Sequence, residues 1–405
     1  MNKIINIFNN KCNNKYEIYD NTLYFRNDFN EEMNMKLRNK LYKCNKIVFM
    51  EEKSYKLHKS CKSSNYYYNY INCYPTPRNI FNKSISNLPL TIKQIDFGYH
   101  FNQPVDRLPP LLENLKFNYD FNQTVDNLPP FLLSLEFGYY FNKPINKLPY
   151  LLQNIKLNFC FNQSIDKLPI FVTKVIINCT FIHSVNKLPD FIDIIELGSA
   201  SLTEPIKRLP KMLKKLILSE ESMYFSNIPL HENLEYLELG RWFSGDLNFN
   251  FTNNRLNTLI LHSDCHKYKN LPESIKTLTL VLVYINIDLL NNLPNSIEEL
   301  TLTDTVYIHD NLKLYSKLNS ELNNVLNNLP NSIKKLNLKK TTIQLILDNL
   351  PNSIEHLSLP INYDLVINKL PKNIMVIECN KTYKFIKNLK KNKKIKIIFY
   401  NNLFN

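Results

Sequence analysis

Few side chains in this chain of 405 residues are grouped in a way that could support chemistry. The densest group of potential metal ligands is the short segment His262-Ser-Asp-Cys-His266. A zinc site needs four ligands from separated elements held in a tetrahedron, and no second histidine–cysteine segment accompanies this one. We therefore interpret the segment as an ordinary turn, and we expect no metal site.

Motifs for phosphate binding or nucleophilic catalysis are also missing. The sequence contains no Gly-x-x-x-x-Gly-Lys, Gly-x-Gly-x-x-Gly or Gly-x-Ser-x-Gly. Of its five glycines, four (Gly98, Gly138, Gly198 and Gly240) occupy the same place after a predicted strand. Because this leaves almost no glycine for a phosphate-binding loop, the sequence predicts a protein that is not an enzyme and that binds no cofactor.

A repeat of twenty residues organises the chain instead. The segment from Leu108 to Asn127, LPPLLENLKFNYDFNQTVDN, recurs almost position for position in the next two segments of equal length. Leu-Pro pairs keep this period at Pro89, Pro109, Pro129, Pro149, Pro169 and Pro189. A unit of this size cannot bury its apolar face alone, so the period predicts a solenoid of stacked coils.

Each coil is predicted to contribute one short strand. With the leucine of Leu-Pro as position 1, apolar residues occupy positions 1, 5, 8, 10, 14 and 18. Positions 8 and 10 flank a polar residue, which is the period-two pattern of a half-buried strand. Twenty residues leave no room for a full helix on the return, and proline at position 2 favours an extended return. The expected fold is mainly β, with parallel strands, few helices and fourteen regular coils between Ile95 and Cys379.

Two further positions of the coil are polar or small. Position 11 is glycine or asparagine, which predicts a left-handed turn after the strand. Position 15 is asparagine, and we expect a structural ladder in which these side chains point inward and bond the buried backbone of the bends: Asn102, Asn122, Asn142 and Asn162. The alternative, that Asn82, Asn122 and Asn162 are glycosylation acceptors, is not favoured because the repeat itself generates the acceptor pattern.

The segments FNQPVDRLP, FNQTVDNLP, FNKPINKLP and FNQSIDKLP resemble FNIP repeats, which are known from amoebal and giant-virus proteins. The resemblance covers about Phe81 to Pro189. It implies a curved, leucine-rich-repeat-like solenoid that binds other proteins, sometimes behind an N-terminal F-box, and it implies no catalytic residues. No F-box pattern is visible here, so a substrate receptor of a ubiquitin ligase is kept only as an alternative function.

Three regions are expected: degenerate N-terminal capping coils (1–78), the repeat solenoid (79–383) and a basic C-terminal cap (384–405). In the first region, strands are predicted at Leu23–Phe25 and Ile47–Phe49. Two strands, at Leu237–Leu239 and Leu259–Leu261, are predicted between Pro229 and Pro272. Between Pro294 and Pro330 apolar residues recur at helical spacing, which predicts a short helix containing Leu318, Leu322, Val325 and Leu326.

Two columns of side chains are predicted on the solenoid surface, with neighbours about 5 Å apart. Position 9 supplies alternating charges, Asp96, Lys116, Glu136 and Lys156, and position 12 supplies aromatic rings, Tyr99, Tyr119, Tyr139 and Phe159. Both columns could serve only register and self-packing. Because tyrosine-rich surfaces are typical interaction hot spots, we take the eight residues as the predicted site for an unidentified protein partner.

The formal net charge of +14 makes nucleic acid or another polyanion the alternative partner. This partner is not favoured, because clustered lysines occur only near the C-terminus: Lys384, Lys387, Lys390, Lys391, Lys393, Lys394 and Lys396.

Eight scattered cysteines without Cys-x-x-Cys indicate free thiols in a reducing compartment. The sequence has no membrane-spanning apolar run and no secretory signal core. We expect a monomeric, intracellular, cytoplasmic protein without membrane contact, the nucleus being an alternative location through the C-terminal lysine cluster.

Overall fold

The computed structural model describes residues 15–50, 79–178, 181–198, 202, 204–218, 223–224, 227–240, 242–243, 255–262, 271–282, 287–304 and 312–400. The chain divides into two compact parts, an N-terminal half (Met1–Ile192) and a C-terminal half (Asp193–Asn405). Five of the eight cysteines (Cys12, Cys61, Cys73, Cys179 and Cys265) lie outside the described residues, as does the His262–His266 segment beyond His262.

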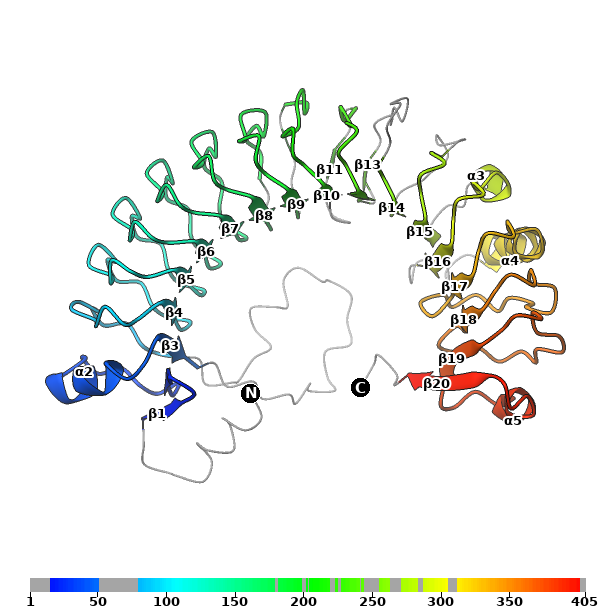
Figure 1. Ribbon diagram of the computed structural model, residues 1–405, viewed down its shortest axis with the longest axis horizontal. Coiled ribbons are helices and arrows are strands. Elements are labelled where there is room, and N and C mark those ends of the chain that lie inside the picture. Colours follow the sequence, from blue (N-terminus) through cyan, green and yellow to red (C-terminus); the bar gives the residue numbers. More distant parts are fainter. Residues whose placement is uncertain are drawn as a thin grey trace. The chain divides into compact units, whose positions relative to one another are not determined.

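The N-terminal half contains a parallel sheet with one strand per coil (Figure 1). A hairpin precedes it, in which β1 (Tyr16–Tyr19) pairs antiparallel with β2 (Thr22–Phe25). From β2 onward each strand pairs in parallel with the next one: β3 (Lys46–Phe49), β4 (Gln94–Asp96), β5 (Asn114–Lys116), β6 (Ser134–Glu136), β7 (Asn154–Leu157) and β8 (Lys174–Ile177). The two strands predicted before residue 50 are thereby confirmed. Helix α2 (Met35–Leu41), which the sequence did not predict, replaces the extended return between them; Asn34 caps it by accepting a hydrogen bond from the backbone N–H of Leu37.

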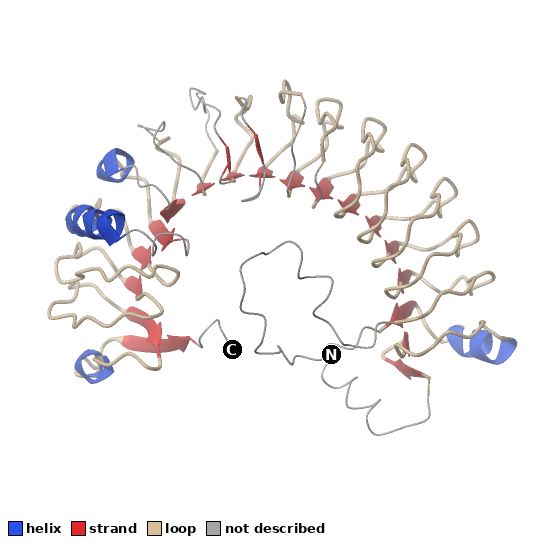
Figure 2. Cartoon of the chain, turned by 180° about the vertical axis from the view of Figure 1, so that it is seen from behind, coloured by secondary structure: helices blue, strands red, loops and turns tan. Residues whose placement is uncertain are grey.

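The C-terminal half continues the one-strand-per-coil pattern with parallel neighbours throughout its main sheet (Figure 2). Its strands are β9 (Ile194–Leu197), β10 (Lys215–Leu218), β12 (Tyr236–Leu239), β14 (Thr258–Leu261), β15 (Thr277–Leu282), β16 (Glu299–Asp304), β17 (Lys335–Asn337), β18 (His356–Ser358), β19 (Val376–Asn380) and β20 (Lys396–Tyr400). A separate parallel pair is formed by β11 (Met223–Tyr224) and β13 (Trp242–Phe243). The predicted series of fourteen coils is confirmed, and β12 and β14 are the two strands predicted between Pro229 and Pro272.

The helix predicted between Pro294 and Pro330 is confirmed. Helix α4 (Leu312–Asn327) occupies the return of that enlarged coil, and it buries the side chains of Leu322, Val325 and Leu326. The short helices α3 (Ile287–Asn291) and α5 (Ile386–Lys390) were not predicted.

Two rows of phenylalanine fill the core of the N-terminal half. In each of three consecutive coils the ring at position 10 stacks on the ring at position 14, with centroids 3.8 Å apart for Phe97 and Phe101 and 3.6 Å apart for Phe117 and Phe121. The position 14 rings of consecutive coils also stack on each other, with ring centroids 6.2 Å apart for Phe101 and Phe121. Each coil therefore completes its hydrophobic core only against its neighbours, as solenoid stacking requires.

The left-handed turn predicted at position 11 is wrong for the described glycines, because none of them has a positive φ. What these sites require is space. A β-carbon at Gly98 would overlap the side chain of Asn79, and one at Gly138 would overlap the backbone carbonyl of Asn118. Glycine is therefore needed here because another segment approaches closely. Close approach is, beside a positive φ, the other common reason for a glycine.

The Leu-Pro signature begins a tight turn that leads into the strand. The proline carbonyl at position 2 accepts a hydrogen bond from the N–H at position 5; the distances are 3.1 Å for Pro109 and Leu112 and 3.2 Å for Pro129 and Leu132. The same bond recurs in the C-terminal half, at 3.1 Å for Pro330 and Ile333. Positions 3 and 4 are the central residues of this turn, so their side chains are directed away from the core.

Candidate functional site

The predicted column of charges lies along the sheet of the N-terminal half, because β4 to β7 pair in register at position 9. The Glu136 carboxylate lies 3.1 Å from the ammonium groups of both Lys116 and Lys156. Asp96 instead pairs with Lys46 of β3, at 3.4 Å. These two carboxylates and three lysines form a charge ladder that supports register and leaves the side chains partly exposed.

The predicted aromatic column is assembled by the fold. Consecutive rings at position 12 stack nearly in parallel, with centroid distances of 4.3 Å for Tyr99–Tyr119, 4.6 Å for Tyr119–Tyr139 and 4.5 Å for Tyr139–Phe159. The interplanar angles are 17° or less. The three tyrosines are half-buried and Phe159 is exposed, so the column presents ring edges to solvent.

Backbone hydrogen bonds hold the aromatic column in place. The carbonyl of Tyr99 accepts from the N–H of Asp120, and the carbonyl of Tyr119 accepts from the N–H of Tyr140. The ring of Tyr140 also packs edge-on against Tyr119 and Tyr139. These contacts fix the position of the column on the coils.

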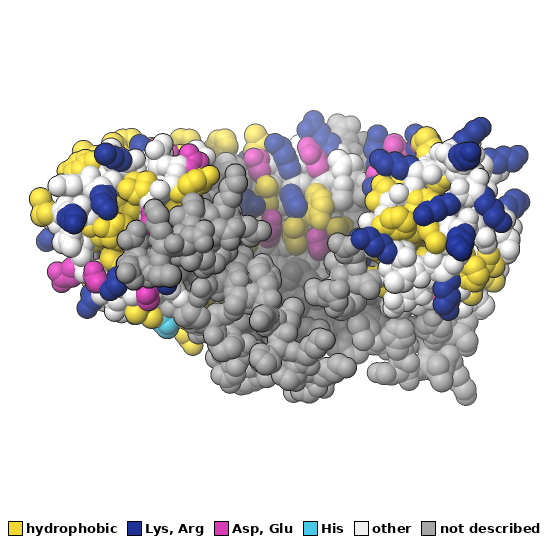
Figure 3. Space-filling view, turned by 90° about the horizontal axis from the view of Figure 1, so that it is seen from below, with side chains coloured by type: hydrophobic (Ala, Val, Ile, Leu, Met, Phe, Trp, Pro, Cys, Tyr) yellow, Lys and Arg dark blue, Asp and Glu magenta, His cyan; other side chains and the backbone are white. Residues whose placement is uncertain are grey.

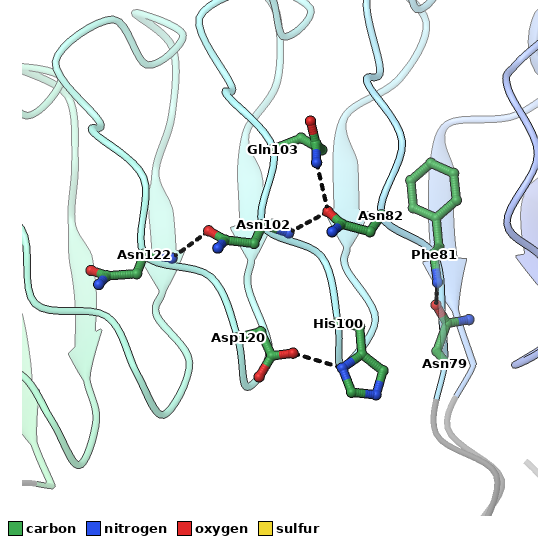
Figure 4. A network of polar contacts seen from close by, with 8 residues as sticks. All are labelled: Asn79, Phe81, Asn82, His100, Asn102, Gln103, Asp120 and Asn122. Atoms are coloured by element: carbon green, nitrogen blue, oxygen red, sulfur yellow. Dashed lines mark hydrogen bonds and ion pairs between the residues drawn. The ribbon is translucent and has the colours of Figure 1, made fainter.

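One polar contact borders the column at position 13. The Nδ1 atom of His100 lies 2.6 Å from the Asp120 carboxylate one coil later, as Figure 4 shows. Partial burial, with the neighbouring Tyr119 hydroxyl, raises the pKa of Tyr139 above its ordinary value.

The asparagines at position 15 bond one another in series. The Oδ1 atom of Asn82 accepts from the backbone N–H of Asn102 at 2.9 Å, and that of Asn102 accepts from the N–H of Asn122 at 3.0 Å (Figure 4). The same bond links Asn122 to Asn142 and Asn142 to Asn162, each at 3.0 Å. These side chains are partly or fully exposed. They therefore satisfy backbone donors at the surface of the bend, and not inside the core as the sequence had suggested.

A polar cluster in the C-terminal half was missed by sequence reasoning. The Glu238 carboxylate accepts from the Tyr236 hydroxyl at 2.8 Å and lies 3.0 Å from Nε2 of His262, while the Lys215 ammonium lies over the Tyr236 ring. Hydrogen bonding to His262, with Tyr236 and Lys215 adding to it, lowers the pKa of Glu238 against the opposing effect of burial. The sequence could have indicated that Tyr236 and Glu238 lie on the same face of one strand, because they are two residues apart. His262 joins them only through the register of β12 with β14.

The remaining sequence expectations concern metals, thiols and membranes. Across the described residues, no three His, Cys, Asp or Glu side chains are grouped so that they could hold a metal ion. Cys44 and Cys379 are buried, and burial raises the pKa of the Cys379 thiol to about 11. No helix within the described ranges combines the length and apolar character that a membrane crossing requires.

The C-terminal lysines are exposed on α5, on β20 and on the turn between them, except for Lys384, which is exposed just before α5. Lys384 pairs with Asp364 at 2.7 Å, and Lys390 lies over the Phe399 ring. Figure 3 shows basic side chains gathered at this end of the C-terminal half, at the right of the view.

Parallel strands at one per coil, short coils of about twenty residues and an interior of leucine, isoleucine and phenylalanine define a leucine-rich-repeat-like solenoid. Residues 105–140 match the family model described as FNIP Repeat, which confirms the type of repeat in that segment.

Among solved structures, the chain is similar to CroV588, described as a novel circular LRR protein structure (22% identity, TM-score 0.44, 91% of this chain and 68% of that chain). It is also similar to YopM from Yersinia enterocolitica WA-314 (14% identity, TM-score 0.29, 78% of this chain and 84% of that chain). No curated protein matches the sequence.

Proposed function

We propose that this protein is a non-enzymatic scaffold that binds another protein through the aromatic column and the charge ladder of its N-terminal half. Repeat solenoids expose extended surfaces that are typically used to bind proteins. The observation that carries the proposal is the stack of four exposed-edge rings on four consecutive coils. Aromatic side chains held in this way supply a large contact area with little loss of conformational entropy on binding.

The charge ladder gives this surface selectivity. Its alternating signs are fixed at one charge per coil, so a partner with charges in a different order would place like charges opposite each other. The partner that fits is a protein segment with apolar side chains for the ring edges and charges complementary to Lys116, Glu136 and Lys156.

Affinity purification with mass spectrometry, comparing the wild-type chain with the double variant Tyr119→Ala/Tyr139→Ala, tests this proposal. The variant should lose a partner that the wild type captures, while its circular dichroism stays unchanged because both rings lie outside the core. The matched control is Tyr42→Ala, an exposed tyrosine of the C-cap of α2, which should retain the partner. Capture that survives in the double variant would show that the site is elsewhere.

The exposed C-terminal lysines favour a second candidate, an electrostatic binder of nucleic acid or another polyanion. Lys387, Lys391, Lys393 and Lys394 lie on the surface within a few residues of one another. Gel mobility shift with duplex DNA over a salt series separates the candidates, since phosphate contacts weaken steeply with salt. Absence of binding at low salt excludes this function. Tight binding at low salt that is lost in the triple variant Lys391→Ala/Lys393→Ala/Lys394→Ala would support it.

A further inference from the structure

The turns at positions 3 and 4 expose large apolar side chains on consecutive coils of the N-terminal half. At position 4 these side chains form a row, which we call the turn stripe: Leu111, Phe131, Leu151, Phe171 and Phe191. Leu90, Tyr150 and Ile170, at position 3 of their coils, add exposed apolar side chains beside this row. The Tyr150 ring packs edge-on against the Phe171 ring, with centroids 4.9 Å apart. The stripe is a separate feature from the aromatic column, which follows the strand and does not precede it.

The stripe is large for the surface of a monomer. Its rings Phe131, Phe171 and Phe191 and the adjoining Tyr150 are 45–63% exposed. These four expose about 400 Å² if a whole aromatic side chain counts as about 200 Å². With the exposed aliphatic side chains the patch reaches about 700 Å², more than the roughly 300–600 Å² of the largest patch on a typical monomer. It also comes close to the roughly 800 Å² per partner that a standard specific interface buries.

The turn itself does not require these apolar residues. Three coils of the C-terminal half form the same proline-to-isoleucine turn with Asn-Ser at positions 3 and 4: Asn295-Ser296, Asn331-Ser332 and Asn352-Ser353. The Ser296 hydroxyl donates to the carbonyl of Ile275 in the preceding coil at 2.8 Å, whereas the hydroxyls of Ser332 and Ser353 are buried without a hydrogen-bond partner among the described residues. Since a polar pair satisfies the same geometry, the phenylalanines and leucines of the stripe are explained by contact with something outside the coil.

We propose that the turn stripe is the interface through which two copies of this chain form a dimer, in place of the monomer expected from the sequence. A second copy carries the same row at the same spacing, so the side chains of one row meet the gaps of the other along its whole length. Any other occupant would have to match this spacing independently. An isologous contact of this kind is the commonest arrangement of homo-oligomers.

The charges next to the stripe are mixed. Beside the Leu-Pro turns, Lys147 pairs with Asp126 at 3.0 Å and Lys187 pairs with Asp166 at 2.9 Å. Arg107 and Lys167, at the same position of the repeat, are exposed and form no ion pair with the described residues. The border is therefore only partly neutralised, and the size and spacing of the stripe are what favour a second copy as occupant.

Analytical ultracentrifugation of the full chain over a micromolar concentration series tests the proposal. The wild type should show a reversible monomer–dimer equilibrium. A graft of the polar turn, Pro130→Asn/Phe131→Ser with Ile170→Asn/Phe171→Ser, should weaken dimerisation at least tenfold. The graft keeps a turn sequence that this fold already uses, and thermal unfolding verifies that it folds; Phe131→Lys alone is the second variant if it does not.

The control Met375→Ser removes an equally exposed apolar side chain from the C-terminal half and should leave the equilibrium unchanged. A wild-type chain that stays monomeric throughout the series overturns the proposal, whether or not it sediments with phosphatidylcholine–phosphatidylserine vesicles. So does a graft that dimerises with the wild-type constant. The Tyr119→Ala/Tyr139→Ala variant should still dimerise, which separates this interface from the proposed partner site.

Discussion

The side chain of Asn79 occupies the space beside Gly98 in which a β-carbon at residue 98 would lie. Asn79 is fully buried; its Oδ1 atom accepts from the N–H of Phe81 and its Nδ2 group donates to the carbonyl of Arg26. This one amide joins the backbone at Phe81 to the coil of β2 through the carbonyl of Arg26. The absence of a side chain at residue 98 is what makes the connection possible.

Substituting either crowded glycine should therefore destabilise the N-terminal half. We expect Gly98→Ala and Gly138→Ala to lower the free energy of unfolding by about 1–3 kcal/mol, the usual cost of overpacking. Gly138→Ala should cost more, because the carbonyl of Asn118 belongs to the backbone and cannot rotate away. Urea unfolding measures both, with the exposed Thr124→Ala as control; unchanged midpoints would contradict the crowding.

The stability that the asparagine ladder supplies should depend on the acceptor oxygen of each side chain and not on its amide nitrogen. Asn122→Ala removes the acceptor for the Asn142 N–H and should cost about 0.5–1.5 kcal/mol. Asn122→Asp retains an oxygen at the same place and should cost less. Thermal unfolding of the two variants side by side provides the measurement, and equal losses would show that the hydrogen bond is unimportant.

Reversing the central charge of the ladder should produce a salt-dependent loss of stability. Glu136→Lys places three like charges in a row with Lys116 and Lys156, so we expect a loss of about 1 kcal/mol at low ionic strength. Raising the salt concentration should reduce this loss by screening. Glu136→Gln is the matched control, and a loss that does not depend on salt would indicate a packing defect instead.

The Glu238 cluster predicts acid sensitivity of the C-terminal half. The pKa of Glu238 is lowered from 4.5 on folding, so its contribution to stability is present above that value and is lost as pH falls through the lower folded pKa. Thermal unfolding between neutral and strongly acidic pH should show the wild type losing stability below about pH 4.5 more steeply than Glu238→Gln. Parallel curves for the two proteins would contradict the prediction.

Much of this architecture could be predicted from the sequence because it follows from residue types repeated along one chain. Alternating Leu115 and Phe117 indicate a half-buried strand, and Leu322, Val325 and Leu326 indicate the buried face of α4. The period of twenty brings equivalent residues together, so the columns of charges and rings also followed from the repeat.

The tertiary structure alone decided what depends on the distance between coils. Three features depend on how neighbouring coils lie against each other. Gly98 is required for space, His262 reaches Glu238, and Phe131 and Phe171 are exposed to solvent on a turn. A local pattern specifies which residues are apolar or small, but not which neighbouring segment approaches them. For this protein, the sequence therefore determined the coil and the columns that its repeat generates, while the stacking of coils determined which segments approach each other closely.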